Sequence, residues 1–178
     1  MSFDLGDLAP ALELSDTAGA AHTLPAPGEC PATVVVWTCN HCPYALAWHD
    51  RLQAVAADYA DRGVRFLQVN SNDPERYPAD APAAMRERVE AGEFASPYLH
   101  DAEQDVAHSF GALKTPDVFV LDGDLRLAYR GAPDSDYDDP SQNAAWLRGA
   151  LDALLDGDTP DPAATEPVGC SVKYRAPG

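Results

Sequence analysis

Two cysteines separated by two residues, Cys39 and Cys42, have the residue type and the spacing to do redox chemistry. They follow an apolar, β-type run and open a helical pattern. At a helix start, unpaired backbone N–H groups and the positive end of the helix dipole favour a negative charge on the first sulfur. We therefore expect Cys39 to ionise near neutral pH, below the usual range of a thiol. The spacing also lets Cys42 turn back and close a disulfide with Cys39.

The elements around this pair form a β-α-β pattern. Residues Ala32 to Trp37 are continuously apolar or β-branched, which is typical of a strand buried on both faces. Helical spacing then continues to Arg62 and ends at Gly63, and Val64 to Asn70 predicts a second strand. The two strands should be parallel, because a crossover helix joins them. Residues 71–73 should then emerge at the sheet edge that carries Cys39.

The remaining patterns predict an α/β fold with a central mixed sheet, an N-terminal hairpin and a C-terminal tail. We interpret residues 1–178 as a single domain: 1–31 as a hairpin extension, 32–155 as the core and 156–178 as a Pro- and Asp-rich tail. The other expected elements are a hairpin within 11–24, helices over 83–91, 102–110 and 143–155, antiparallel strands over 117–121 and 125–130, and an added strand within 168–174.

Composition limits the possible partners and surroundings of the chain. The formal net charge is −17, and Lys114 and Lys173 are the only lysines. Such a surface makes nucleic acid and anionic membranes poor partners. The N-terminus has acids where a secretory signal has basic residues, so we expect a cytoplasmic protein. There, four cysteines argue for chemistry rather than a disulfide scaffold. The sequence makes no prediction of the oligomeric state.

The same acidic, lysine-poor composition suits a salt-rich cytoplasm. In molar salt the Debye length shrinks to about 3 Å, so repulsion among the carboxylates is screened. We therefore hypothesise a halophilic source.

Four motifs, in order, resemble one branch of the thioredoxin-like superfamily, the redoxin or peroxiredoxin-like proteins related to AhpC/TSA. Together they span nearly the whole chain. They are Cys-Asn-His-Cys-Pro-Tyr at 39–44, Asn-Ser-Asn-Asp at 70–73, Thr-Pro-Asp followed by Phe-Val-Leu-Asp at 115–122, and Gly-Cys-Ser-Val-Lys-Tyr at 169–174.

The resemblance implies roles for the residues of these motifs. Cys39 would be the exposed attacking thiol and Cys42 the buried resolving one. A cis bond would precede Pro116, and the backbone of Thr115 would lie against the cysteines and pair with an extended substrate. The other residues that we expect to contact substrate are Trp37, Thr38, Asn40 and Pro43.

His41 lies between the two cysteines, where an imidazolium could stabilise a thiolate on Cys39. Stabilising the reduced form makes a couple more oxidising, and we predict a potential of roughly −200 to −230 mV. We assign no role to the other histidines, which are His22, His49, His100 and His108.

The sequence leaves alternatives open for the group that takes the proton and for the role of Cys170. Thioredoxins carry a buried aspartate in the strand before the site, but residues 33–38 contain no acid. Water, His41 or Asp73 could take the proton instead, and Asn72 could support the site. Cys170 is either a buried structural thiol or a third redox cysteine. Cys30, at the opposite end of the strand from Cys39, is expected to be inert.

Three functions are compatible with these residues. The leading one is a thiol–disulfide oxidoreductase that needs no metal or organic cofactor and exchanges electrons between protein or small-molecule disulfides and a redox partner. The second is a thiol peroxidase. Peroxiredoxins, however, have Thr three residues before the reactive Cys and Arg three residues before the Phe that matches Phe119. Here these positions are Val36 and Pro116. The third is a zinc or copper module, although structural zinc usually needs four ligands.

Overall fold

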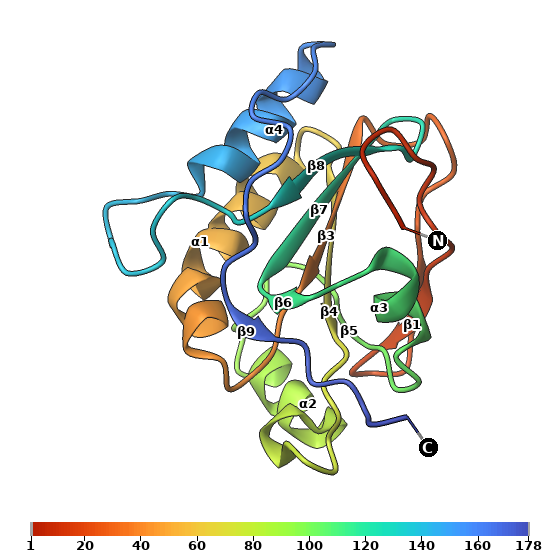
Figure 1. Ribbon diagram of the computed structural model, residues 1–178, viewed down its shortest axis with the longest axis vertical. Helices are drawn as coiled ribbons and strands as arrows, with labels where there is room; N and C mark the ends of the chain where they lie inside the picture. The colour runs from red at the N-terminus through yellow and green to blue at the C-terminus, as the bar shows by residue number, and fades with distance from the viewer. Residues whose placement is uncertain (1, 178) are drawn as a thin grey trace.

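A seven-stranded mixed sheet forms the centre of the computed structural model, which describes residues 2–177 (Figure 1). The strand order is β2-β1-β5-β4-β3-β7-β8. The strands are β1 (Glu13–Asp16), β2 (Ala21–Thr23), β3 (Ala32–Trp37), β4 (Arg65–Asn70), β5 (Tyr98–His100), β7 (Asp117–Asp122) and β8 (Leu127–Gly131). The helices are α1 (Pro43–Ala60), the short 3-10 helix η1 (Pro78–Asp80), α2 (Pro82–Glu90), α3 (Asp105–Phe110) and α4 (Ala145–Leu155).

Strand β3 lies in the middle of this sheet, as its uninterrupted apolar sequence predicts. It pairs in parallel with β4 and antiparallel with β7, and all six of its residues are buried. The expected β-α-β unit is therefore confirmed, with α1 as the crossover. Because side chains alternate along a strand, Val34 and Val36 face one side of the sheet, whereas Val35 and Trp37 face the other.

Helices α1 and α4 cover the first of these faces (Figure 1). Trp48 and Leu52 of α1 pack there with Leu147 and Leu151 of α4. The buried carboxylate of Asp134 joins the two helices: it accepts hydrogen bonds from the Trp48 indole (2.8 Å) and from the backbone N–H of residue 144 (2.9 Å), just before α4. This layer fixes the direction of α1, whose first turn carries the cysteine pair.

The second face is covered by α3 and by the N-terminal segment. There Phe110 and Phe119 pack against Trp37, and Phe3 packs against Phe110. Helix α3 begins at Asp105, later than the predicted start at residue 102. The reason is local: Gln104 adopts a left-handed conformation (φ 66°), which is incompatible with a helix interior.

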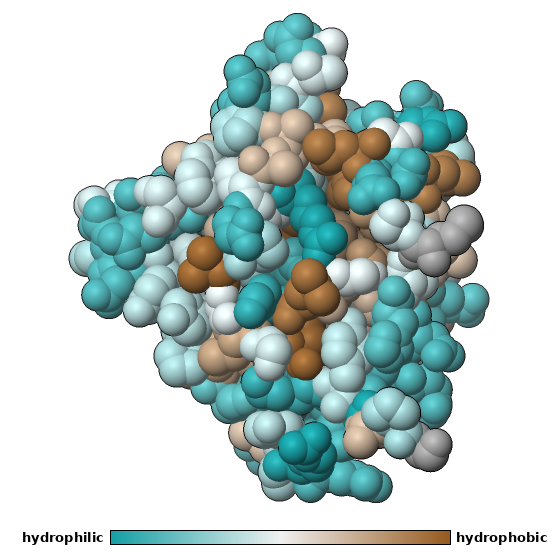
Figure 2. Space-filling view, viewed as in Figure 1, coloured by the Kyte–Doolittle hydropathy of each residue, from teal (hydrophilic) through white to brown (hydrophobic). Residues whose placement is uncertain are grey.

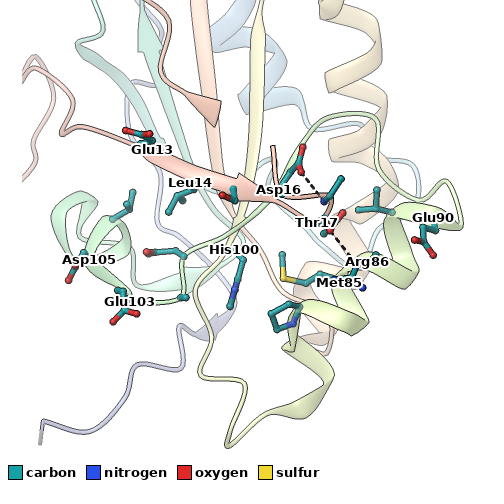
Figure 3. A pocket seen from close by; sticks show the side chains of 18 residues that line it. Glu13, Leu14, Asp16, Thr17, Met85, Arg86, Glu90, His100, Glu103 and Asp105 are labelled. Atoms are coloured by element: carbon teal, nitrogen blue, oxygen red, sulfur yellow. Dashed lines mark hydrogen bonds between the residues drawn. The ribbon is translucent and has the colours of Figure 1, made fainter. Parts of the chain in front are cut away.

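The N-terminal hairpin is confirmed and joins the main sheet, because β1 pairs antiparallel with both β2 and β5. Arg86 of α2 donates a hydrogen bond to the Thr17 carbonyl in the hairpin turn (3.3 Å; Figure 3). Between hairpin, α2 and α3 lies a cavity of about 930 Å³, with Glu13, Glu103 and Asp105 on its walls (Figure 3). Of the described residues that line this cavity, none belongs to the predicted redox site.

A second, two-stranded sheet lies beside the C-terminal edge of β3. Strand β6 (Lys114–Thr115) pairs antiparallel with β9 (Cys170–Ser171), so that Lys114 lies opposite Ser171 and Thr115 opposite Cys170. The added strand expected within 168–174 is thus present, whereas β6 was not predicted. The C-terminal tail crosses the molecule from α4 to reach this position (Figure 1).

The surface agrees with the charged composition. The face in Figure 2 is mainly hydrophilic, and its hydrophobic atoms form small, separate patches, one of them over the region of β6. Leu113, which precedes β6, is 57% exposed. In the described part of the chain, no helix has both the length and the apolar character needed to cross a membrane.

Candidate active site

The two cysteines lie where β3 ends and α1 begins. Helix α1 starts at Pro43, directly after Cys42, because proline has no N–H to lose in a first helical turn. The backbone N–H of Cys42 points at the Cys39 sulfur at 3.3 Å. The strand-to-helix junction therefore supplies the donor that the sequence predicts for a negative charge on Cys39.

Thr115 closes the site from the opposite side. Its hydroxyl oxygen lies 3.6 Å from the Cys39 sulfur, and its carbonyl oxygen accepts a hydrogen bond from the Cys42 thiol at 3.2 Å. The Thr115–Pro116 peptide bond is cis, as the family resemblance implies. Both thiols are thus enclosed between the start of α1 and the segment before β7.

Cys39 is not the exposed thiol that the resemblance implies. It is only 1% exposed, and Cys42 is fully buried. The physical reason is the close approach of Thr115 on one side and of a histidine and a carboxylate on another. Attack of Cys39 on a protein disulfide therefore requires these covering groups to move aside.

The two thiols titrate as a pair. The hydrogen bond between them lowers the pKa of Cys42 to about 4 and raises the pKa of Cys39 far above that of a free thiol. Burial and the nearby Asp80 carboxylate add to the rise at Cys39. The helix start donates to this sulfur as expected, whereas the hydrogen bond with Cys42, burial and the Asp80 carboxylate raise the pKa of Cys39, which is opposite to the expected direction. The pair loses its first proton readily and its second with difficulty.

Asp80 is the buried acid that the sequence analysis did not identify. It lies at the end of η1, is fully buried, and has a carboxylate oxygen within 4.8 Å of both the Cys39 sulfur and a His41 ring nitrogen. Residues 33–38 contain no acid, but a loop about forty residues later supplies one. Its sequence context, between Pro78 and Pro82, indicates only a loop.

The Asp80 carboxylate is held by four hydrogen bonds. One oxygen accepts from the backbone N–H of Asn40 (2.6 Å) and the Asn70 amide (3.0 Å), and the other from Nδ1 of His41 (2.5 Å) and the Asn72 amide (3.1 Å). A carboxylate with this many donors is held in one position.

His41 is oriented by this carboxylate and by an aromatic ring. Because Nδ1 donates to Asp80, Nε2 is left as the nitrogen that can exchange a proton. The imidazole also stacks on Tyr77 at a centroid distance of 5.2 Å, and its side chain is 29% exposed. His41 thus connects the buried pair with solvent.

The residues expected to contact substrate fall into two groups. Trp37 and Thr38 are buried, so their contact with substrate stays a prediction that the exposed surface does not support. Trp37 points into the core because of the strand alternation, and its indole donates to Ser71 (2.9 Å), while the N–H of Thr38 continues the pairing with β4. Asn40 is partly exposed and Pro43 is exposed, so both stay candidates for substrate contact.

Asn72 and Asp73 lie at the expected sheet edge but serve different partners. Asn72 donates to Asp80 and therefore supports the site. Asp73 instead holds the C-terminal tail, because its N–H donates to the Lys173 carbonyl (2.9 Å) and its carboxylate lies 3.7 Å from the Arg175 guanidinium. The acid beside the cysteines is Asp80 rather than Asp73, so Asp80 is better placed than Asp73 to influence the proton of the pair.

The other two cysteines differ in position. Cys170 of β9 is partly exposed and packs against the cluster of Cys39, Cys42 and Ala45. Cys30 precedes β3, at the opposite end of that strand from the pair. The fold therefore brings three of the four cysteines together.

A metal at this site would have to use Cys39, His41 and Asp80, the one group of three potential ligands found among the described residues. The arrangement fits a metal poorly. Both Asp80 oxygens already accept two hydrogen bonds each, and the His41 nitrogen nearest to Asp80 is committed to it. Binding an ion would break this network.

Comparison with known proteins also identifies a redox family. The model of the AhpC/TSA family matches residues 5–130. No curated protein matches the sequence significantly. Among solved structures, an uncharacterized conserved protein from Geobacillus kaustophilus is similar over 99% of this chain and 95% of that chain, with 36% identity and a TM-score of 0.93.

Two more distant structures share the fold. A putative thiol:disulfide interchange protein, DsbE, from Chlorobium tepidum has 18% identity and a TM-score of 0.68, over 86% of this chain and 99% of that chain. Peroxidoxin BcpB from Mycobacterium tuberculosis has 18% identity and a TM-score of 0.63, over 87% of this chain and 97% of that chain. At this identity the likeness concerns the fold alone, which is thioredoxin-like.

Proposed function

The chain belongs to the AhpC/TSA family of thioredoxin-like redox proteins, and we propose that it acts as a thiol–disulfide oxidoreductase through Cys39 and Cys42. One observation carries the proposal: both sulfurs lie at the start of α1 and contact the same residue, Thr115, at 3.6 and 3.2 Å. This arrangement keeps the two thiols together while one of them bonds to a partner sulfur.

The hydrogen bonds support Cys39 as the nucleophile. When Cys39 loses its proton, the resulting charge is stabilised by the N–H of Cys42, and the Cys42 thiol donates to the Thr115 carbonyl. The raised pKa of Cys39 and the lowered pKa of Cys42 oppose this protonation state, so Cys39 attacks only after a base has taken its proton. The Cys39 thiolate attacks a substrate disulfide, forming a mixed disulfide and releasing one substrate thiolate. Cys42 then attacks the Cys39 sulfur, which forms the Cys39–Cys42 disulfide and releases the second substrate thiolate.

His41 and Asp80 are suited to handling the protons of this exchange. The dyad resembles the base and orienting acid of other thiol enzymes: Asp80 fixes the ring, and Nε2 can accept or return a proton. A raised pKa at Cys39 makes such a base useful, since attack requires the thiolate.

The test is a side-by-side assay of insulin disulfide reduction by the wild type and by Cys39→Ser, Cys42→Ser and Cys30→Ser variants. We expect either of the first two changes to reduce the rate to background. Cys30→Ser, which alters a cysteine before β3 at the end of that strand opposite to the site, should keep the wild-type rate. Full reductase activity in Cys39→Ser would contradict the proposal.

A thiol peroxidase is the second candidate, and the burial of Cys39 favours it. A hydroperoxide is small enough to enter a site whose sulfur is only 1% exposed. The Cys39 thiolate would attack the terminal oxygen of the hydroperoxide. The O–O bond breaks, Cys39 becomes a sulfenic acid, and the alkoxide or hydroxide that leaves takes a proton to give an alcohol or water. Cys42 would then attack that sulfur, closing the disulfide and releasing water.

The same variants separate the two functions. A peroxidase forms its sulfenic acid on Cys39 alone, so a first turnover of hydrogen peroxide should survive in Cys42→Ser. Disulfide exchange needs Cys42 to release the substrate. Peroxide turnover together with no insulin reduction would therefore favour the peroxidase.

A further inference from the structure

The C-terminal tail occupies the place beside the cis-proline that the resemblance assigns to a substrate. Strand β9 pairs antiparallel with β6, and Cys170 lies opposite Thr115, the residue that contacts both active-site sulfurs. An extended substrate cannot pair with Thr115 while β9 is there. The position of a substrate cysteine is taken by a cysteine of the chain itself.

This tail is built into the fold. Val172 is buried in the core on the α3 side, and its N–H donates to the Leu113 carbonyl at 3.0 Å. The hydroxyl of Tyr174 donates to the Ala112 carbonyl (2.6 Å), and the N–H of Lys173 donates to Asn72 (2.8 Å). Gly169 lies so close to β6 that a Cβ there would collide with the Thr115 carbonyl. These contacts hold Cys170 at a defined position.

The three sulfurs form a series from buried to accessible. Cys42 is fully buried, and Cys39 and Cys170 belong to the same packed cluster. Cys170 packs against the pair but keeps partial exposure. Of these three thiols, it is the one that a protein partner can reach.

The charges around Cys170 also differ from those of the rest of the protein. The two lysines of this strongly acidic chain, Lys114 and Lys173, both lower the pKa of Cys170 by their charge. Burial and the neighbouring Cys42 nevertheless raise it to about 11. When Cys42 is in a disulfide it carries no negative charge and no longer raises the pKa of Cys170. The charges of the two lysines then lower this pKa without an opposing effect from Cys42. Cys170 becomes a better nucleophile when the pair is oxidised.

We propose that Cys170 is a third redox cysteine, which exchanges disulfides with Cys42 and receives electrons for the buried pair from a protein dithiol. This inference rests on the proposed function of the pair. In the first step the Cys170 thiolate attacks the Cys42 sulfur of the Cys39–Cys42 disulfide. A Cys42–Cys170 bond forms, the Cys39–Cys42 bond breaks, and Cys39 leaves as a thiolate.

The second step uses the external dithiol. One of its thiolates attacks the Cys170 sulfur and releases Cys42. Its other thiol then attacks the partner's own sulfur in the mixed disulfide and releases Cys170. In total, two partner thiols are oxidised to a disulfide, and one disulfide of this protein is reduced to two thiols.

The first experiment traps the intermediate in the full-length Cys39→Ser chain. The protein is oxidised with diamide, free thiols are alkylated, and linked peptides are identified by mass spectrometry. We expect a Cys42–Cys170 disulfide as the main product, and none in the Cys39→Ser, Cys170→Ser double variant. A folded Cys39→Ser protein without this link overturns the proposal.

The second experiment measures how fast a reduced thioredoxin, used as the dithiol probe, reduces the oxidised protein. Cys170→Ser should slow this step at least tenfold, and Cys30→Ser is the matched control with the wild-type rate. Equal rates for Cys170→Ser and wild type overturn the proposal.

A backbone variant separates a relay from a simple cover. Gly169→Ala should push β9 away from Thr115 while Cys170 is retained, because the added methyl meets the Thr115 carbonyl. We expect several-fold slower reduction by thioredoxin. Faster reduction would show that β9 only covers the pair, and overturns the relay.

Failure of the relay can be told from failure of the proposed function. A wild-type protein that forms no Cys39–Cys42 disulfide and reduces no insulin contradicts the proposed function. A wild-type protein that does both, but is matched by Cys170→Ser in every rate, contradicts the relay alone.

Discussion

His41 Nδ1 lies 2.5 Å from a carboxylate oxygen of Asp80, so the histidine between the two cysteines is held by a fully buried acid from a distant loop. The two groups have opposite electrostatic effects on Cys39. A proton on His41 favours the thiolate, whereas the charge of Asp80 opposes it. Both should therefore influence the redox potential.

Replacing the histidine should make the pair less oxidising. We expect a wild-type potential of roughly −200 to −230 mV and a lower value in His41→Ala, because the thiolate form loses a stabilising neighbour. Redox titration against a glutathione buffer, followed by alkylation, measures both. An unchanged potential would dismiss a role for His41 in tuning the couple.

Removing the charge of Asp80 should make Cys39 ionise more easily, whereas removing His41 should make it ionise less easily. The pKa of Cys39 is raised by Cys42, by burial and by the Asp80 carboxylate, so Asp80→Asn should lower it. Ultraviolet absorbance of the thiolate as a function of pH follows this change. Glu87→Gln, which removes an exposed charge from α2, is the control and should leave the titration as in the wild type. A higher pKa of Cys39 in Asp80→Asn would refute this account.

One buried histidine, His49, and one half-buried histidine, His100, should make the protein less stable in mild acid. Burial lowers the pKa of His49 and His100 below 6.5. Below that pH the unfolded chain binds protons that the native state does not. The stability that the neutral forms of His49 and His100 contribute is therefore complete above pH 6.5. It is lost as the pH falls toward the pKa values of these histidines in the folded protein.

The histidine effect can be measured by urea unfolding at about pH 7.5 and about pH 5.5, on either side of the ordinary histidine pKa. His49→Gln should reduce the loss between the two values, because glutamine can still donate to the Glu93 carbonyl but does not titrate. An identical pH dependence in His49→Gln and wild type would exclude His49 as a contributor.

Salt should stabilise the protein. With a net charge of −17, repulsion between carboxylates weakens as potassium chloride is raised from low to molar concentration. Thermal unfolding should shift to higher temperature over this range. Equal midpoints at both ends would contradict the hypothesis of a salt-rich source.

The sequence by itself determined the elements and the thiol pair. Apolar and helical periodicity along residues 32–70 predicts strand, helix and strand correctly, because it reports which faces of an element are buried. The motif around Pro116 predicts the cis bond through family resemblance. Position in the chain is enough to place Cys39 and Cys42 at a helix start.

Tertiary structure decided what surrounds that pair. Three features of the site depend on contacts between segments that lie about forty to seventy-five residues apart in the chain. They are the contact of Asp80 with His41, the cover that Thr115 forms over Cys39, and the pairing of Cys170 with Thr115. Periodicity describes one segment at a time, so it cannot show which loop brings a charge to a site or where a tail returns. These contacts depend on how helices, sheet and tail pack, and they determine which sulfur a partner can reach.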